Sequence, residues 1–167
     1  FIGTKIAYVN TLMEMCHHLP NTNVDEVMNG LKMCNKRIIS DKYLSGGMGD
    51  GGGCHPRDNI ALSWLSDELG LKFNWFDNIM KQREVQTEWL ADMIEKESNG
   101  LPITILGKSF KPQTNITTGS PSILLYNILI ERKLPVTMYD PYIDEPFDDW
   151  QDMSEYDGVP QCYFIGT

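Results

Sequence analysis

Three features are missing from this sequence, and each absence excludes a class of protein. The 167 residues contain no apolar run of the roughly 20 residues that a membrane helix needs, and the first residues do not resemble a secretion signal. The four cysteines show no Cys-x-x-Cys spacing, which argues against a zinc site or a disulfide framework. Basic residues number only 14 against 23 acidic ones, and the net charge of -9 argues against a nucleic-acid partner. We therefore expect a cytoplasmic protein with no metal, membrane or nucleic-acid partner.

The first part of the chain has the apolar periodicity of helices. Apolar residues recur at helical spacing over residues 1–16 and over a short stretch that begins with a capping box from Asn23 to Glu26. They recur again over residues 56–69, where Gly70 would end the helix. A long amphipathic helix is predicted over residues 73–98, and Asn99-Gly100 would end it. Everything before Gly100, apart from the loops, is therefore predicted to be helical.

The pattern changes after Gly100. Short β-branched runs over residues 101–106, 136–139 and 163–165 predict strands, and residues 123–131 predict a helix between the first two. A strand, a helix and a strand at this spacing favour a parallel sheet. We therefore predict an α/β protein with a helical domain over residues 1–99 and a sheet domain over residues 100–167. Both ends of the chain fall in or beside predicted elements, so we expect it to be a piece of a longer protein.

The segment with the most chemical information reads Gly51-Gly52-Gly53-Cys54-His55-Pro56-Arg57-Asp58. Glycines let a backbone approach a ligand closely and point its N–H groups at it. A cysteine at the end of such a loop, beside a helix start, lies near the positive end of the helix dipole, which favours the nucleophilic thiolate. The alternative is a free cysteine buried under a glycine loop. The residues alone leave these two interpretations about equal.

Several motifs together resemble one enzyme family. GGGCHPRD is similar to the GG-[SH]-C-x-x-[KR]-D signature of the UDP-glucose, GDP-mannose and UDP-N-acetylhexosamine dehydrogenases. Further similar motifs occur in the family's order, namely Lys36-Arg37-Ile38, Lys42-Tyr43-Leu44, Ile105-Leu106-Gly107-Lys108-Ser109-Phe110-Lys111-Pro112, Ser120-Pro121-Ser122 and Tyr139-Asp140-Pro141. The resemblance covers nearly the whole chain. It implies a central helical dimerisation domain followed by a truncated Rossmann-like sheet domain.

The resemblance also implies an activity. Members of this family oxidise the C6 alcohol of a nucleotide sugar to a carboxylate in two steps with two NAD, and UDP-glucose is the simplest substrate to expect here. Cys54 would hold the aldehyde stage as a thiohemiacetal and then a thioester. Asp58 would assist the water that hydrolyses the thioester. Arg57 would bind phosphate groups of NAD.

Substrate contacts are implied on both sides of the cysteine. The segment Tyr43–Gly49 would lie along the nucleotide diphosphate, and Arg37 would reach across a homodimer interface into the partner's sugar site. For Arg37 a solvated arginine at a helix end is the alternative. The full set of expected substrate-binding residues is Arg37, Tyr43, Leu44, Ser45, Gly49, Gly51, Phe110 and Lys111. The long helix over residues 73–98 would form the dimer seam.

The sequence departs from the family in three respects. One is the loop before Cys54, which is one residue longer than in the commonest members and has Ser45 where several carry lysine. The family's NAD-binding domain and its catalytic lysine and asparagine precede the residues that match Phe1, so this chain alone is expected to be inactive. Thr118 and Gly119 stand where many relatives carry an arginine and a glutamate. Two alternatives therefore stay open. The substrate could be GDP-mannose or a UDP-N-acetylhexosamine, or the chain could be a non-catalytic dimerisation and nucleotide-binding module.

Overall fold

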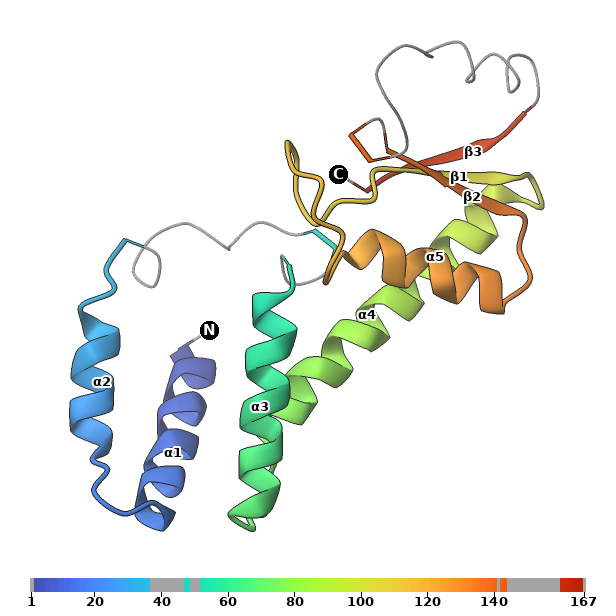
Figure 1. Ribbon diagram of the computed structural model, residues 1–167. Helices are drawn as coiled ribbons and strands as arrows, with labels where there is room; N and C mark the ends of the chain where they lie inside the picture. Colours follow the sequence, from blue (N-terminus) through green and yellow to red (C-terminus); the bar gives the residue numbers. More distant parts are fainter. Residues whose placement is uncertain (1, 37–46, 49–51, 141, 144–159, 167) are drawn as a thin grey trace. The chain divides into compact units, whose positions relative to one another are not determined.

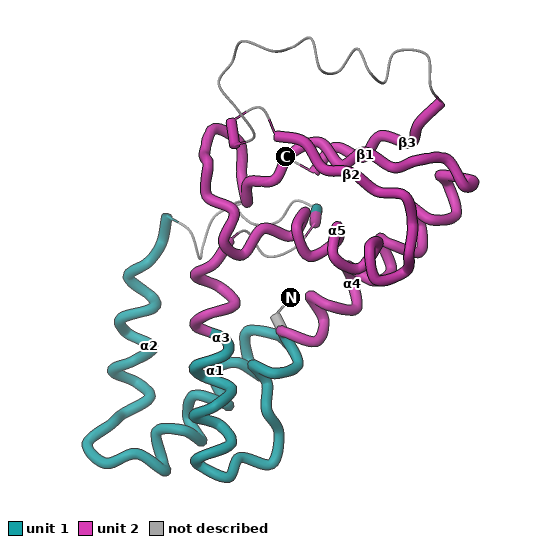
Figure 2. Tube along the Cα trace, turned by 45° about the vertical axis from the view of Figure 1, so that its right-hand side comes forward, with its two compact units in different colours: residues 1–47, 59–79 teal, residues 48–58, 80–167 magenta. Residues whose placement is uncertain are grey.

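The computed structural model describes residues 2–36, 47–48, 52–140, 142–143 and 160–166 (Figure 1). The elements follow in the order α1 Ile2–His18, α2 Val24–Lys32, α3 Cys54–Glu68, α4 Trp75–Ser98, β1 Ile103–Leu106, α5 Pro121–Glu131, β2 Val136–Tyr139 and β3 Cys162–Ile165. By its contacts the chain forms two compact units (Figure 2): unit 1 is residues 1–47 and 59–79, and unit 2 is residues 48–58 and 80–167. The predicted helical part and the change to α/β structure after Gly100 are confirmed.

Two asparagines in unit 1, Asn23 and Asn74, cap the starts of α2 and α4. The side-chain oxygen of Asn23 accepts a hydrogen bond from the N–H of Asp25 at 2.8 Å, so Asn23 caps α2 as predicted. A capping box would use the N–H of Glu26 instead. Asn74 caps α4, which the sequence pattern did not indicate. Its oxygen accepts the N–H of Asp77 at 3.0 Å, and its amide donates to Ser63 of α3. Helix α4 therefore begins at Trp75, two residues later than the sequence suggested.

Unit 2 contains a parallel sheet in the order β2-β1-β3. In the register, Ile103 of β1 pairs with Val136 of β2 and with Cys162 of β3. Helix α5 lies along one face of the sheet (Figure 1). It begins at Pro121, two residues before the predicted start, because proline fits the first turn of a helix. One hydrophobic core joins α4, β1, α5 and β2, and its buried members are Leu90, Ala91, Ile94, Ile103, Ile105, Leu125, Ile128, Leu129 and Val136.

A charged cluster ties the end of α5 to α4 within unit 2. The Arg132 guanidinium contacts three carboxylates on successive turns of α4: Glu88 at 2.6 Å, Asp92 at 2.7 Å and Glu95 at 3.1 Å. The hydrogen bond to Glu88 is the main cause that raises the pKa of Arg132. Only 24% of this side chain is exposed, so water screens the cluster less than an ordinary surface pair.

Glycine and asparagine end the helices where the sequence placed the stops. Gly70 after α3 has φ +67°, and Asn99 and Gly100 after α4 have φ +50° and +81°. Such left-handed residues close a helix, and glycine adopts the conformation without a steric penalty. Asn99-Gly100 thus marks the change from helix to sheet in the chain. By contacts, however, residues 80–98 of α4 belong to the same compact unit as the sheet. As a domain boundary, Asn99-Gly100 stays a prediction.

Candidate functional site

Cys54 is the first residue of α3. The N–H of Arg57 donates to the carbonyl oxygen of Gly53 at 3.3 Å, which closes the first helical turn around the cysteine. The sequence placed Cys54 just before the helix, and the structure includes it in the first turn together with Pro56. The Cys54 side chain is exposed. The alternative of a buried free cysteine therefore does not hold, and the role of nucleophile stays a prediction.

Arg57 and Asp58 form an ion pair beside the cysteine. The Arg57 Nε and an Asp58 oxygen lie 2.8 Å apart. The hydrogen bond from Arg57 lowers the pKa of Asp58, and the same bond raises the pKa of Arg57. Because 71% and 63% of the two side chains are exposed, solvent screens the pair and its contribution to stability is small. The pair keeps a carboxylate and a guanidinium, both accessible, within one turn of the thiol.

Residues 107–119, which follow β1, form a loop anchored by Asp140. This carboxylate at the end of β2 is 3% exposed, and its oxygens accept the N–H groups of Lys108 at 2.7 Å, Ser109 at 3.1 Å and Tyr142 at 2.9 Å. Burial raises the pKa of Asp140, but the hydrogen bonds from these backbone groups outweigh burial and lower it. From the sequence, Asp140 was predicted only to end a strand. Its donors Lys108 and Ser109 lie about 30 residues earlier in the chain, so no local pattern indicates these hydrogen bonds.

Phe110 and Lys111 lie on this loop, which also closes on itself. The Phe110 N–H donates to Ile116 at 3.1 Å, and the Ser109 hydroxyl donates to the Lys111 carbonyl at 2.9 Å. The Lys111 ammonium lies 5.3 Å from the centre of the Phe110 ring, a cation–π distance. An aromatic ring and an amine thus lie side by side on a hydrogen-bonded loop.

The loop meets the two glycines that precede Cys54. A Cβ added to Gly52 would lie 2.7 Å from the Phe110 ring, and one added to Gly119 would lie 2.5 Å from the Gly53 nitrogen. Such contacts leave no room for a side chain at either position. The structure therefore brings the turn that carries Cys54, Arg57 and Asp58 against the loop that carries Phe110 and Lys111, all within unit 2.

The other predicted substrate residues fall outside the described part of the chain. These are Arg37, Tyr43, Leu44, Ser45, Gly49 and Gly51. For NAD, the predicted phosphate ligand Arg57 carries an exposed guanidinium, which suits a phosphate group. In Rossmann folds a glycine-rich turn that leads directly from a strand into a helix binds the dinucleotide. The described residues contain no such turn, because residues 107–120 separate β1 from α5.

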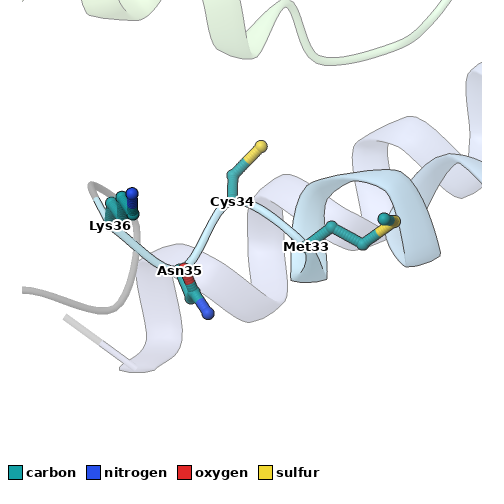
Figure 3. A pocket seen from close by; sticks show the side chains of 4 residues that line it. All are labelled: Met33, Cys34, Asn35 and Lys36. Atoms are coloured by element: carbon teal, nitrogen blue, oxygen red, sulfur yellow. The ribbon is translucent and has the colours of Figure 1, made fainter.

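A hollow lies at the end of α2 in unit 1. It has a volume of about 320 Å³ and is lined by Met33, Cys34, Asn35 and Lys36 (Figure 3). Cys34 and Asn35 point to opposite sides of the backbone, so the polar groups do not converge (Figure 3).

Within the described ranges no three His, Cys, Asp or Glu side chains are grouped to hold a metal ion. Among those same residues no helix has the length and apolar character to traverse a membrane.

Comparison with known proteins identifies the family. The model of the UDP-glucose/GDP-mannose dehydrogenase family, central domain, matches residues 1–85, about half of the chain. The chain belongs to this family. Members of the UDP-glucose/GDP-mannose dehydrogenase family are NAD-dependent oxidoreductases that act on nucleotide sugars.

Individual relatives agree with this assignment. The chain is 28% identical over 144 residues to UDP-glucose 6-dehydrogenase TuaD of Bacillus subtilis (strain 168), which covers 84% of the chain and 31% of TuaD. It is 30% identical over 144 residues to UDP-glucose 6-dehydrogenase YwqF of the same strain, with 84% and 32% covered. The chain thus spans about a third of the length of these curated relatives.

Solved structures share the fold. The crystal structure of a ternary complex of GDP-mannose dehydrogenase from Pseudomonas aeruginosa matches with a TM-score of 0.76 and 21% identity, over 98% of this chain and 38% of that one. A UDP-glucose dehydrogenase from Pyrobaculum islandicum matches with a TM-score of 0.59 and 18% identity, over 99% and 46%. At these identities the likeness establishes the fold alone, and it confirms the predicted α/β class.

Proposed function

We propose that this chain is the part of an NAD-dependent nucleotide-sugar 6-dehydrogenase that carries the catalytic cysteine and a nucleotide-contacting loop. UDP-glucose is the proposed substrate, because the curated relatives TuaD and YwqF are UDP-glucose 6-dehydrogenases. The observation that carries the proposal is the exposed thiol of Cys54 in the first turn of α3, on a glycine turn packed against the loop of Phe110 and Lys111.

The described residues can perform distinct steps of this chemistry. The Cys54 thiolate adds to the C6 aldehyde and retains the sugar as a thiohemiacetal, later as a thioester, so the reactive aldehyde is not released. Asp58, kept ionised by Arg57, accepts a proton from the water that hydrolyses the thioester. The Arg57 guanidinium is suited to a phosphate of NAD. Bound NAD supplies the hydride acceptor for each oxidation.

Phe110 and Lys111 are proposed to contact the nucleotide. An aromatic face suits a base or ribose, and an ammonium group suits a phosphate or hydroxyl oxygen. Arg37, Tyr43, Leu44, Ser45, Gly49 and Gly51 complete the proposed substrate set. GDP-mannose is the second candidate substrate, because the matching family model is that of the UDP-glucose/GDP-mannose dehydrogenases.

The test is an assay of the protein encoded by the complete gene with NAD and a panel of UDP-glucose, GDP-mannose and UDP-N-acetylmannosamine. We expect two NADH per sugar carboxylate with UDP-glucose, and no turnover by the 167-residue chain alone. Faster turnover of another sugar would reassign the substrate. Nucleotide binding without NADH formation, from a complete protein that has a dinucleotide-binding domain, would favour the non-catalytic module instead.

We also propose a homodimer formed through α4. Three exposed apolar side chains follow at intervals of four residues: Val85 with 68% exposed, Trp89 with 56% and Met93 with 43%. Residues four apart lie on one face of a helix, so these side chains form a continuous apolar stripe. A second copy of the same helix would cover this stripe with an identical surface, as two-fold symmetric dimers do.

Replacing Trp89 by glutamate tests the dimer. A buried tryptophan at an interface commonly contributes 2 kcal/mol or more, so Trp89→Glu is expected to weaken dimerisation by at least about 30-fold. Light scattering across a dilution series would measure the change. Trp64→Glu is the matched control, because Trp64 on α3 is 62% exposed but lies outside the stripe. An equal loss in both variants, or no loss in Trp89→Glu, would contradict the assignment.

A further inference from the structure

The turn before Cys54 has no side chains with which to fix its own position. Gly52 and Gly53 carry only backbone atoms, and glycine has more conformational freedom than any other residue. The place of the thiol therefore depends on the surfaces that these two residues touch. One such surface is the Phe110 ring, whose nearest atom lies 2.7 Å from where a Cβ of Gly52 would be.

The other surface is the backbone at Gly119. A Cβ added there would lie 2.5 Å from the Gly53 nitrogen, 2.6 Å from its Cα and 2.7 Å from the Gly52 carbonyl carbon. All three neighbours are backbone atoms, so none can rotate away as a flexible side chain could. Gly119 also has φ +75°, which disfavours any side chain on its own. Both the space and the conformation thus require glycine.

Two other glycines share the backbone conformation of Gly119 but not its lack of space. Gly70 and Gly100 have φ +67° and +81°, close to that of Gly119, but a Cβ at either would meet nothing within 4 Å. An alanine at Gly100 therefore imposes the same type of backbone strain without pushing on a neighbour. The two positions have similar φ angles, and they differ in the backbone atoms that a Cβ at position 119 would meet.

The segment that contains Gly119 is itself held in place. The Ser120 N–H donates to Thr117 at 2.9 Å, which forms a turn around Gly119, and the buried Ser120 hydroxyl donates to Ser109 at 3.4 Å. Arg83 of α4 reaches the Gly119 carbonyl oxygen at 3.5 Å. Pro121, which follows Ser120, starts α5, and this helix contributes Leu125, Ile128 and Leu129 to the core of unit 2. A push between residues 53 and 119 would therefore displace the glycine turn rather than this segment.

We propose that Gly119 is a positioning residue for Cys54. Its bare backbone is the surface that sets how deeply the Gly52-Gly53 turn sits, and hence where α3 begins and where the thiol stands. The importance of this position for turnover rests on the proposed function, because only a cysteine nucleophile needs such placement. The same loop carries Phe110 and Lys111, so the proposed nucleotide contacts and the thiol are placed by one piece of structure.

The first test measures alkylation of each cysteine by iodoacetamide in the 167-residue chain, with peptide mass spectrometry as the readout. Gly119→Ala is expected to slow Cys54 alkylation at neutral pH by about 2- to 5-fold, because the thiol is displaced from its place in the first turn of α3. Cys34, exposed in unit 1, is the internal reference and should not change. Gly100→Ala should leave Cys54 at the parent rate. Parent-like Cys54 kinetics in Gly119→Ala would overturn the proposal.

A second pair of variants covers the case in which Gly119→Ala does not fold, shown by rapid alkylation of the partly buried Cys16 and Cys162. A Cβ at Gly53 would lie 3.3 Å from the Thr118 methyl and 3.4 Å from the Thr118 carbonyl oxygen. Gly53→Ala should therefore alter Cys54 alkylation, and adding Thr118→Ser, which removes that methyl, should restore part of it. Parent-like kinetics in Gly53→Ala, or no restoration by Thr118→Ser, would overturn the proposal. Thiol kinetics do not depend on turnover, so a failure here is separate from a failure of the proposed enzyme function.

Discussion

Replacing Cys54 by serine is expected to abolish carboxylate formation by the complete enzyme, with a loss of at least about 10³-fold in kcat. A serine hydroxyl is a far weaker nucleophile than a thiolate at neutral pH, and it does not become ionised at a helix start. The structure supports the choice of this cysteine because its side chain is exposed and lies one turn from Arg57 and Asp58. NADH release and quantification of the sugar acid would measure the effect.

Cys34→Ser is the matched control for this experiment. Cys34 is also exposed, but it follows α2 in unit 1, away in sequence from the motif, and its replacement should leave kcat unchanged. Near-parental carboxylate formation by Cys54→Ser would refute the covalent role. An equal loss in both serine variants would show that the loss does not come from the nucleophile.

Replacing Asp140 by asparagine is expected to lower the free energy of unfolding by about 2–3 kcal/mol. Hydrogen bonds to a charged acceptor are worth about 1.5–3 kcal/mol, and one buried carboxylate here accepts three backbone N–H groups. An asparagine amide would present N–H groups to some of these donors and leave them unsatisfied. Urea unfolding followed by circular dichroism would measure the difference.

The pH dependence of stability gives a second readout for Asp140. Its pKa is lowered in the folded state, so its contribution is complete above the ordinary value of 3.8 and is lost as the pH falls through the folded value. The stability of Asp140→Asn should therefore fall less steeply than that of the parent in acid. Asp25→Asn, an exposed aspartate in the first turn of α2, serves as control and should change stability by less than about 0.5 kcal/mol. A parent-like acid response in Asp140→Asn would contradict the assigned role.

Local patterns predicted the elements of the fold well. The apolar periodicity of α4, the left-handed stops at Gly70 and Gly100, and the β-branched runs of β1 and β2 are all properties of neighbouring residues. The parallel sheet followed from the spacing of strand and helix. The start of α4 was misplaced because Asn74 acts partly through α3, and the sequence does not show which residues of another helix an amide will meet.

The candidate site was predictable only in part. The motif around Cys54 indicated the residue and the helix start, and its resemblance to known dehydrogenases supplied the chemistry. The ion pair between Arg57 and Asp58 was not predicted, because adjacent residues on a helix do not normally face each other. The contacts of Asp140 with Lys108 and of Gly119 with Gly53 join residues far apart in the chain, which no local pattern encodes.

The close contact between Gly53 and Gly119 also limits how this protein can diverge. Two stretches 66 positions apart have their main chains in contact, with no layer of side chains between them to absorb a change. A bulkier residue in one stretch would require the other to rebuild at the same time. Across homologues we therefore expect the two stretches to covary, so that a glycine at either position records this contact between backbones and is no evidence of a bound ligand.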